Sequence, residues 1–216
     1  MAVPMSCARP ALAWDTASLS MTNRVIQRQC NFIVHLKNLK KSDLAKQIYD
    51  EQLSNGYPGL ITEAQRLCDS IGIPSITKNR EKEDNKIQWK QRIMEAVERK
   101  NEIQLKRKIQ SFQKLEVMKE EKYEQKEYLS NLTLEEARMF FRVRTKMVKC
   151  KLNQSSDRGN RASLWKCNGC GHVDSQSHIL YCPSYQDLRV GKDLNSDKDI
   201  ANYFKDVLRV REQINC

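Results

Sequence analysis

Glycine and proline are scarce in this chain, which has 7 Gly and 5 Pro among its 216 residues. An all-β fold places these two residues in its many tight turns, so the composition argues against such a fold. The sequence also lacks an apolar run of about 18 residues, the length that a membrane-spanning helix needs. Its first 21 residues have no continuous apolar core like that of a secretory signal. We therefore expect an intracellular, mainly α-helical protein of the nucleus or cytoplasm that is not secreted and contacts no membrane.

Apolar residues recur at helical intervals over most of the chain. The pattern predicts helices over 24–37, from Ser42 to Gly56, from a Thr62–Gln65 capping box to Gly72, from Lys86 through Phe112, over 134–150, and from Ser196 onward. In the first of these, Val25, Phe32, Ile33 and Leu36 recur at roughly helical intervals and are the expected apolar positions. The polar stretch 78–85 is the clearest internal boundary. We expect an N-terminal helical segment (1–78), a charged helical segment (79–130) and a C-terminal segment (131–216).

Three of the eight cysteines lie within 16 residues of one another, whereas the other five are scattered. An even number of cysteines is compatible with disulfides, but a Lys-rich chain without a secretory signal does not fit a secreted disulfide scaffold. A chance grouping of free thiols is the remaining alternative. Clustered cysteines in a reducing compartment more often bind a metal ion.

The cluster has the spacing C-x2-C-x7-H-x3-C, formed by Cys167, Cys170, His178 and Cys182. Two thiolates separated by two residues form a tight turn, in which Gly169 relieves crowding. His178 and Cys182 are four residues apart, so one helical turn presents both to the same point. Four such ligands with no open position are typical of one structural, tetrahedral Zn²⁺. The fold class predicted is therefore mainly α with a small C-terminal CCHC zinc knuckle.

His172 is a competing imidazole ligand. It follows Cys170 by only two residues, and ligation by both would strain the loop between them. A catalytic zinc site would keep a water ligand and have an acid nearby in a cleft, which this compact spacing does not indicate. We therefore expect a structural metal site that uses His178.

Positive charge is concentrated just before this cluster. Residues 138–168 contain nine Lys and Arg against Asp157 alone, a net charge of +8. On a helix over 134–150 the cations at 138, 142, 146 and 149 would follow one face. Such a block repels itself unless a polyanion neutralises it, although a solvated basic face is the simpler reading. The residues expected to contact nucleic acid, mainly at phosphates, are Arg138, Arg142, Lys146, Lys149, Arg158, Arg161 and Lys166. Trp165 is expected either to stack on an unpaired base or to pack in the core.

Several of these motifs together resemble a known family. The segment Phe141–Met147, the basic loop, Leu164–Cys170, Ser177–Pro183 and the pair Leu188–Arg189 resemble the region that follows the polymerase in non-LTR (LINE-like) retrotransposon reverse transcriptases. Upstream, Trp14–Leu19, Arg24–Arg28 and Asn55–Gly59 resemble the segment that joins polymerase to knuckle. The resemblance implies a CCHC zinc knuckle after an arginine-rich helix, with template RNA or target DNA as the partner.

The chain departs from that family in its catalytic motifs. A polymerase palm holds two Mg²⁺ ions with adjacent aspartates, and this sequence contains no Asp-Asp pair. The tail after Cys182 is too short for an endonuclease domain. We therefore expect no enzyme activity, as in a fragment or remnant of an RNA-directed DNA polymerase polyprotein, and a non-catalytic zinc-knuckle module that binds RNA or DNA. The alternative is a zinc-stabilised adaptor that binds a protein partner through helices in 86–128, and a residual enzyme ranks last.

Overall fold

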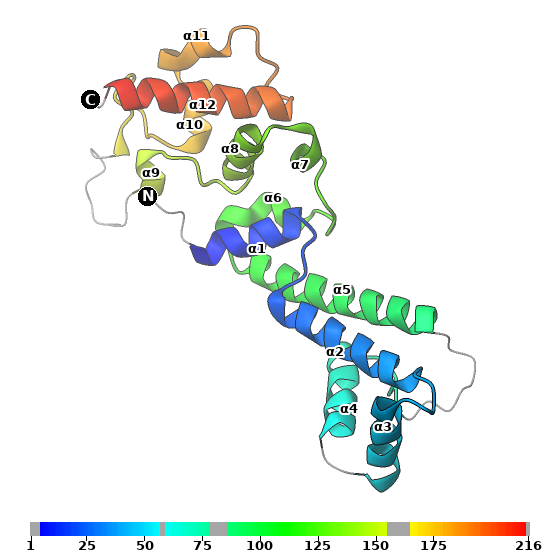
Figure 1. The fold of residues 1–216 in the computed structure, drawn as a ribbon. Coiled ribbons are helices and arrows are strands. Elements are labelled where there is room, and N and C mark those ends of the chain that lie inside the picture. The colour runs from blue at the N-terminus through cyan, green and yellow to red at the C-terminus, as the bar shows by residue number, and fades with distance from the viewer. Residues whose placement is uncertain (1–4, 57–58, 78–85, 155–164, 215–216) are drawn as a thin grey trace. The chain divides into compact units, whose positions relative to one another are not determined.

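The computed structural model describes residues 5–56, 59–77, 86–154 and 165–214 (Figure 1). In chain order its elements are α1 (Met5–Asp15), α2 (Met21–Lys37), α3 (Leu44–Asn55), α4 (Leu60–Ile71), α5 (Lys86–Gln110), the 3₁₀ helix η1 (Gln113–Leu115), α6 (Glu116–Lys119), α7 (Tyr128–Asn131), α8 (Leu134–Arg144), α9 (Lys151–Gln154), α10 (Gln176–Tyr181), the 3₁₀ helix η3 (Pro183–Tyr185), α11 (Gln186–Arg189) and α12 (Asp197–Ile214).

Helices dominate the described residues, which confirms the mainly α-helical fold expected from the sequence. Within the ranges given above, the β pairing consists of one isolated antiparallel bridge between Lys166 and Val173. No helix in those ranges is both long enough and apolar enough to cross a bilayer.

Residues 18–107 form one compact unit that contains α2, α3, α4 and most of α5. Its core is built around the buried aromatic residues Tyr49 and Trp89, which aliphatic side chains from α2, α4 and α5 surround. Gly56 and Gly72 end α3 and α4 in the left-handed conformation, with φ of 63° and 70°. Both helix ends therefore match the expectation from the sequence, because glycine adopts this conformation without a steric penalty.

Three details of this unit differ from the sequence prediction. The buried face of α2 is formed by Ile26, Cys30, Ile33, Val34 and Leu36, together with Asn23. Val25 and Phe32 are exposed instead. Helix α4 begins at Leu60 with Gly59 at the N-cap, so the Thr62–Gln65 capping box is wrong, and Asp43 rather than Ser42 precedes α3. Local sequence propensity does not decide at which of several neighbouring residues a helix begins, or which of its faces is buried, when tertiary packing favours one choice.

The second unit combines residues 1–17 with residues 108–216. This grouping divides the chain differently from the three segments expected from the sequence, because α1 contacts residues that follow it by more than 100 positions. The boundary expected at 78–85 lies outside the described residues. Helix α12 is central here. Ala201 packs with Ala137 and Phe140 of α8, while Tyr203, Phe204 and Val207 pack around Cys167 and Cys182. One helix thus supports both α8 and the cysteine cluster.

Helix α8 begins as predicted but ends early. Thr133 and Glu136 form the expected capping box, in which each side chain bonds the other residue's backbone N–H. The helix ends at Arg144, and the Met147 and Lys146 N–H groups donate to the carbonyls of Arg142 and Val143 at 2.7 and 3.1 Å. This is the hydrogen-bond pattern of a Schellman motif.

Lys146 occupies the left-handed position of this motif, with φ of 53°. The predicted helix over 134–150 is therefore wrong beyond Arg144, and Lys146 and Lys149 do not continue its face. The sequence carries no glycine at this turn to signal the stop. A non-glycine residue in this conformation costs about 1–2 kcal/mol.

Arg144 lies inside the protein rather than on its basic surface. Its guanidinium donates to Asp15 at 3.2 and 3.3 Å and to Glu121 at 2.6 Å, and the Tyr128 hydroxyl donates to Asp15 at 2.8 Å. The Asp15 carboxylate is fully buried and Arg144 is 15% exposed. Burial raises the pKa of Asp15 although Arg144 and Tyr128 favour its charged form. The network fixes α1 against α8 within this unit.

Replacing Arg144 with Met should lower the free energy of unfolding by about 3–5 kcal/mol, because it leaves the buried Asp15 carboxylate without its cationic partner. The folded-state pKa of Asp15 then lies further above its unfolded value, so the loss should grow as pH rises from acid to neutral. Urea unfolding at several pH values measures this. Arg138→Met, on the exposed face of the same helix, should change stability by no more than about 0.5 kcal/mol. Equal effects of the two substitutions would contradict the buried role.

Candidate metal centre

The segment that carries the first two cysteines is a tight, hydrogen-bonded turn. The Cys167 N–H donates to the His172 carbonyl at 2.7 Å, and the Gly171 N–H donates to the Cys167 carbonyl at 2.9 Å. Gly171 has φ of 76°, a conformation that glycine adopts without a steric penalty. The turn directs the thiols of Cys167 and Cys170 toward the same point.

Gly169 is needed in this turn for a steric reason, as the sequence analysis expected. A Cβ atom built on Gly169 would lie 2.6 Å from the Cβ of Ser184 and closer still to its hydroxyl oxygen. Carbon atoms do not approach that closely without rearrangement. The absence of a side chain at Gly169 thus allows the turn to lie against η3.

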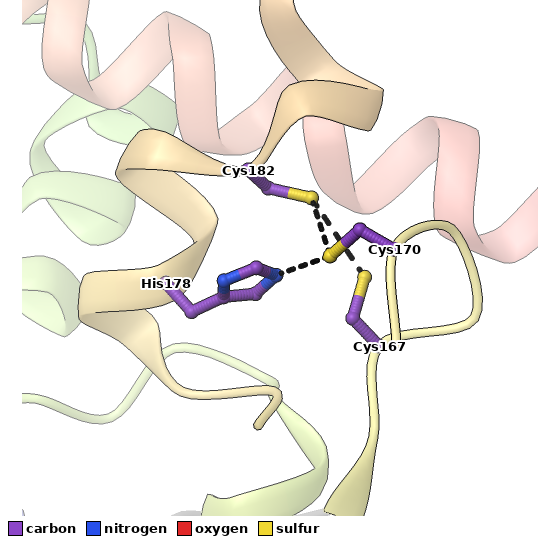
Figure 2. Close-up of side chains that lie close together, drawn as sticks. All are labelled: Cys167, Cys170, His178 and Cys182. Carbon is purple, nitrogen blue, oxygen red and sulfur yellow. Dashed lines mark hydrogen bonds between the residues drawn. The ribbon is translucent and has the colours of Figure 1, made fainter. Parts of the chain in front are cut away.

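Helix α10 supplies the other two side chains. Ser175 caps its start by accepting a hydrogen bond from the His178 N–H at 3.0 Å, and Cys182 follows its last turn. The four side chains converge, as Figure 2 shows. Their ligand atoms all lie within 4.8 Å of one another, so the group could hold a metal ion. Cys170 Sγ is 3.1 Å from His178 Nε2, and Cys182 Sγ is 3.6 Å from Cys170 Sγ and 3.8 Å from Cys167 Sγ.

His172 does not belong to this group, in agreement with the sequence analysis. Its ring stacks beside that of His178 with the centroids 5.8 Å apart, and its side chain is exposed. Its carbonyl instead closes the turn by accepting from Cys167.

The surroundings of Cys167 favour its thiolate form. Burial alone would raise its pKa, but hydrogen bonds from the Cys170 and Gly169 backbone and from His178 outweigh burial and lower the pKa to about 6. Burial raises the pKa of Cys182 to about 11. A bound cation would have to ionise Cys182, so metal binding here releases protons.

Two side chains that the sequence analysis did not assign hold α10 in place. The Arg189 guanidinium donates to the carbonyls of Leu180 and Cys182 at 2.8 and 3.1 Å. The Tyr203 hydroxyl donates to the Ile179 carbonyl at 2.6 Å. The carbonyls of Ile179 and Leu180 lie in the last turn of α10, where a helix has no further backbone donors of its own, so Tyr203 and Arg189 supply them. Their donor role depends on contacts across the fold, which sequence spacing does not reveal.

A buried ion pair connects the turn to α12. Arg211 donates to Asp174 at 2.6 and 3.2 Å and to the Tyr185 hydroxyl at 2.9 Å. Asp174 also accepts from the Lys151 N–H at 2.7 Å, and its side chain is 3% exposed. The Lys151 ammonium donates in turn to the Lys166 carbonyl at 2.7 Å and to Asn168 Oδ1 at 2.6 Å. The cysteine turn, α9 and α12 are thereby held together.

The candidate nucleic-acid residues are distributed over several elements. Arg138 and Arg142 are exposed, one turn apart on α8. Lys146 and Lys149 follow the helix, and they pair with Glu116 at 3.4 Å and with Glu212 at 3.5 Å.

The remaining candidates lie near the cysteine turn or outside the described residues. Lys166 is exposed, whereas Trp165 is half-buried, which is compatible with either of the roles considered for it. Arg158 and Arg161 lie outside the described residues. The expected continuous stripe of four cations on one helix is therefore wrong; only its first two members share a helical face.

Comparison with protein-family models, curated proteins and solved structures finds no match to this chain. Its function is therefore argued from the side chains described above.

Replacing His178 with Gln should abolish four-coordinate metal binding, because an amide is a poor substitute for an imidazole ligand. Co²⁺ titration followed by d–d and thiolate charge-transfer absorption measures this. The loss of affinity should exceed the ~10–100-fold that removing a supporting partner of a ligand costs. His172→Gln is the matched control and should bind Co²⁺ like the unmodified chain. The reverse result would assign the imidazole ligand to His172.

Proposed function

We propose that Cys167, Cys170, His178 and Cys182 bind one structural Zn²⁺ ion. The observation that carries this proposal is the spacing of the sulfur atoms, 3.6 and 3.8 Å. Zn–S bonds of ~2.3 Å at the tetrahedral angle place two sulfurs about 3.8 Å apart. Three thiolates and an imidazole favour zinc over hard cations such as Mg²⁺ and Ca²⁺. All four positions are supplied by protein, so the ion is structural and activates no water.

The zinc-bearing unit is proposed to bind nucleic acid without catalysing a reaction. Three thiolates with one Zn²⁺ carry a net charge of −1, so phosphate contacts must come from cations around the cluster rather than from the metal. Arg138, Arg142 and Lys166 are exposed in that unit and are suited to this role. The exposed part of Trp165, next to Lys166, offers a surface for stacking an unpaired base.

The resemblance to the region after the polymerase in non-LTR retrotransposon reverse transcriptases supports the same proposal. The arginine-rich segment of that resemblance, Phe141–Met147, comprises the last turn of α8 and the turn that follows it. The Leu188–Arg189 pair lies on α11, where Arg189 donates to the Cys182 carbonyl. The chain is then a non-catalytic piece of such a polyprotein, and its ligand is RNA or DNA. Helices α8 and α11 lie in the same unit as the proposed zinc site, so the motifs of the resemblance are brought together in one part of the structure.

A second candidate is a protein-interaction adaptor, favoured by exposed apolar side chains on α5. Ile87, Met94 and Ile103 are 71%, 43% and 53% exposed. An apolar interface depends weakly on salt, whereas phosphate binding weakens steeply as salt rises. Salt titration of any partner therefore separates the two functions.

Protein purified without chelators should contain one zinc per chain by elemental analysis. Because an unfolded knuckle has no preformed site, a chelator should first unfold residues 165–182, as hydrogen exchange would detect. Cys182→Ala should lose the zinc. Cys150→Ala should keep it, because Cys150 is buried in the same core but is not a ligand. Zinc-free protein, or equal zinc in both variants, would overturn the metal assignment.

The double substitution Arg138→Gln/Arg142→Gln should weaken oligonucleotide binding similarly for all sequences. It should also make the slope of log K against log salt shallower by about 1–2 units, because each lost phosphate contact removes about 0.7–0.9. Fluorescence anisotropy at several salt concentrations measures the slope.

The matched control is Lys40→Gln/Lys41→Gln, which removes the same charge from exposed lysines of the other unit. This control should leave the slope unchanged. No binding by the unmodified chain at low salt would reject the nucleic-acid function, and equal slopes in both variants would show that α8 is only solvent-facing.

A further inference from the structure

Three lysines surround an open depression that the sequence analysis did not anticipate. The depression has a volume of about 460 Å³ and is lined by Gln113, Lys114, Glu116, Lys119 and Lys146. Its walls are η1, α6 and the turn that follows α8. Lys114 and Lys119 lie in the segment that the adaptor hypothesis assigned to a protein partner. Three ammonium groups against one carboxylate make this a cationic surface.

Two of the three lysines, Lys114 and Lys146, are held toward the depression by contacts within the same unit. Lys114 Nζ donates to Asn153 Oδ1 at 3.2 Å, while Asn153 Nδ2 donates to the carbonyls of Lys146 and Val148 at 3.0 and 2.9 Å. One amide thus joins Lys114 to the turn that carries Lys146. The ammonium of Lys146 lies 3.4 Å from the exposed Glu116 carboxylate.

The backbone of Lys146 provides an independent observation. Its φ of 53° belongs to the left-handed region, which glycine would occupy without strain. A lysine at this position keeps the strain and places its amine at the depression. Strained residues that persist in this way gather at binding and functional sites.

We propose that this three-lysine depression binds phosphate groups of a nucleic-acid backbone, an inference that rests on the proposed function. The path of the strand then passes over η1 and α6 as well as α8. Helix α9 joins the depression to the zinc cluster, because Asn153 contacts Lys114 while Lys151 contacts Asn168 and the Lys166 carbonyl. Glu116 competes with phosphate for Lys146, so it limits the affinity of the depression.

Lys146→Gly tests the proposal without threatening the fold, because glycine relieves the strain at this position. The variant should unfold at the same temperature as the unmodified chain or at a higher one. Its binding to a labelled, mixed-sequence single-stranded oligonucleotide should weaken roughly fivefold at 0.1 M salt, with a slope shallower by about 1. Lys146→Arg keeps the charge and should bind normally. Lys114→Gln/Lys119→Gln should make the slope shallower by about 2.

Glu116→Gln should act in the opposite direction and tighten binding, because it removes the competing carboxylate. The proposal of phosphate binding at the depression would be rejected by unchanged binding in Lys146→Gly and in Lys114→Gln/Lys119→Gln. Weakened binding in Arg138→Gln/Arg142→Gln would in that case still support the proposed function. No binding by the unmodified chain would reject the proposed function itself. A polyglutamate chain that displaces the oligonucleotide at equal charge concentration would instead assign the depression to an acidic peptide and overturn the phosphate proposal.

Discussion

The buried ion pair between Asp174 and Arg211 determines how the unit that carries the cysteine cluster is assembled. The same carboxylate accepts hydrogen bonds from α12 and from the start of α9, and it sits in the chain between the cysteine turn and α10. A carboxylate this deeply buried is stable only with all its partners in place. The position of the cysteines relative to α9 and α12 is therefore fixed by charge as well as by apolar packing, and the cationic surface around them is fixed with it.

The candidate metal ligands were predictable because their geometry is local. A turn sets the directions of Cys167 and Cys170, and one helical turn sets those of His178 and Cys182, so each pair of ligands can be read from a few neighbouring residues. The same holds for the capping box of Thr133 and Glu136 and for the glycine ends of α3 and α4. In each case the signal lies within four residues, where sequence patterns are most reliable.

Features that depend on distant contacts were not predictable. Arg144 reads as one more cation in a basic block, but Asp15, 129 residues away, draws it into the interior. The turn that ends α8 has a lysine, not a glycine, in the left-handed position, so the sequence gives no signal that the helix stops there. The pattern therefore predicts Lys146 and Lys149 on a face of α8 that they do not share. Val25 and Phe32 are as apolar as their buried neighbours on α2, and the packing of α3, α4 and α5 decides which face is buried. Counting charges along the sequence therefore identifies the basic region, but it does not predict which of its cations are exposed or which lie on one face.

The unit that carries the cysteine cluster is built from two separate stretches of the chain, which has a consequence for synthesis on the ribosome. Helix α1 is made before the other unit, yet its partners on α7 and α8 follow more than 100 residues later, after the whole of that unit. At roughly 5–20 residues per second, α1 waits about 6–25 s before Arg144 is made. Late in that interval the chain already contains every core residue of 18–107, whereas Tyr123, Tyr128 and Arg144, which contact Trp14 and Asp15, are still to be made. The order of synthesis thus favours a nascent chain in which the inserted unit folds first and the N-terminal helix docks last.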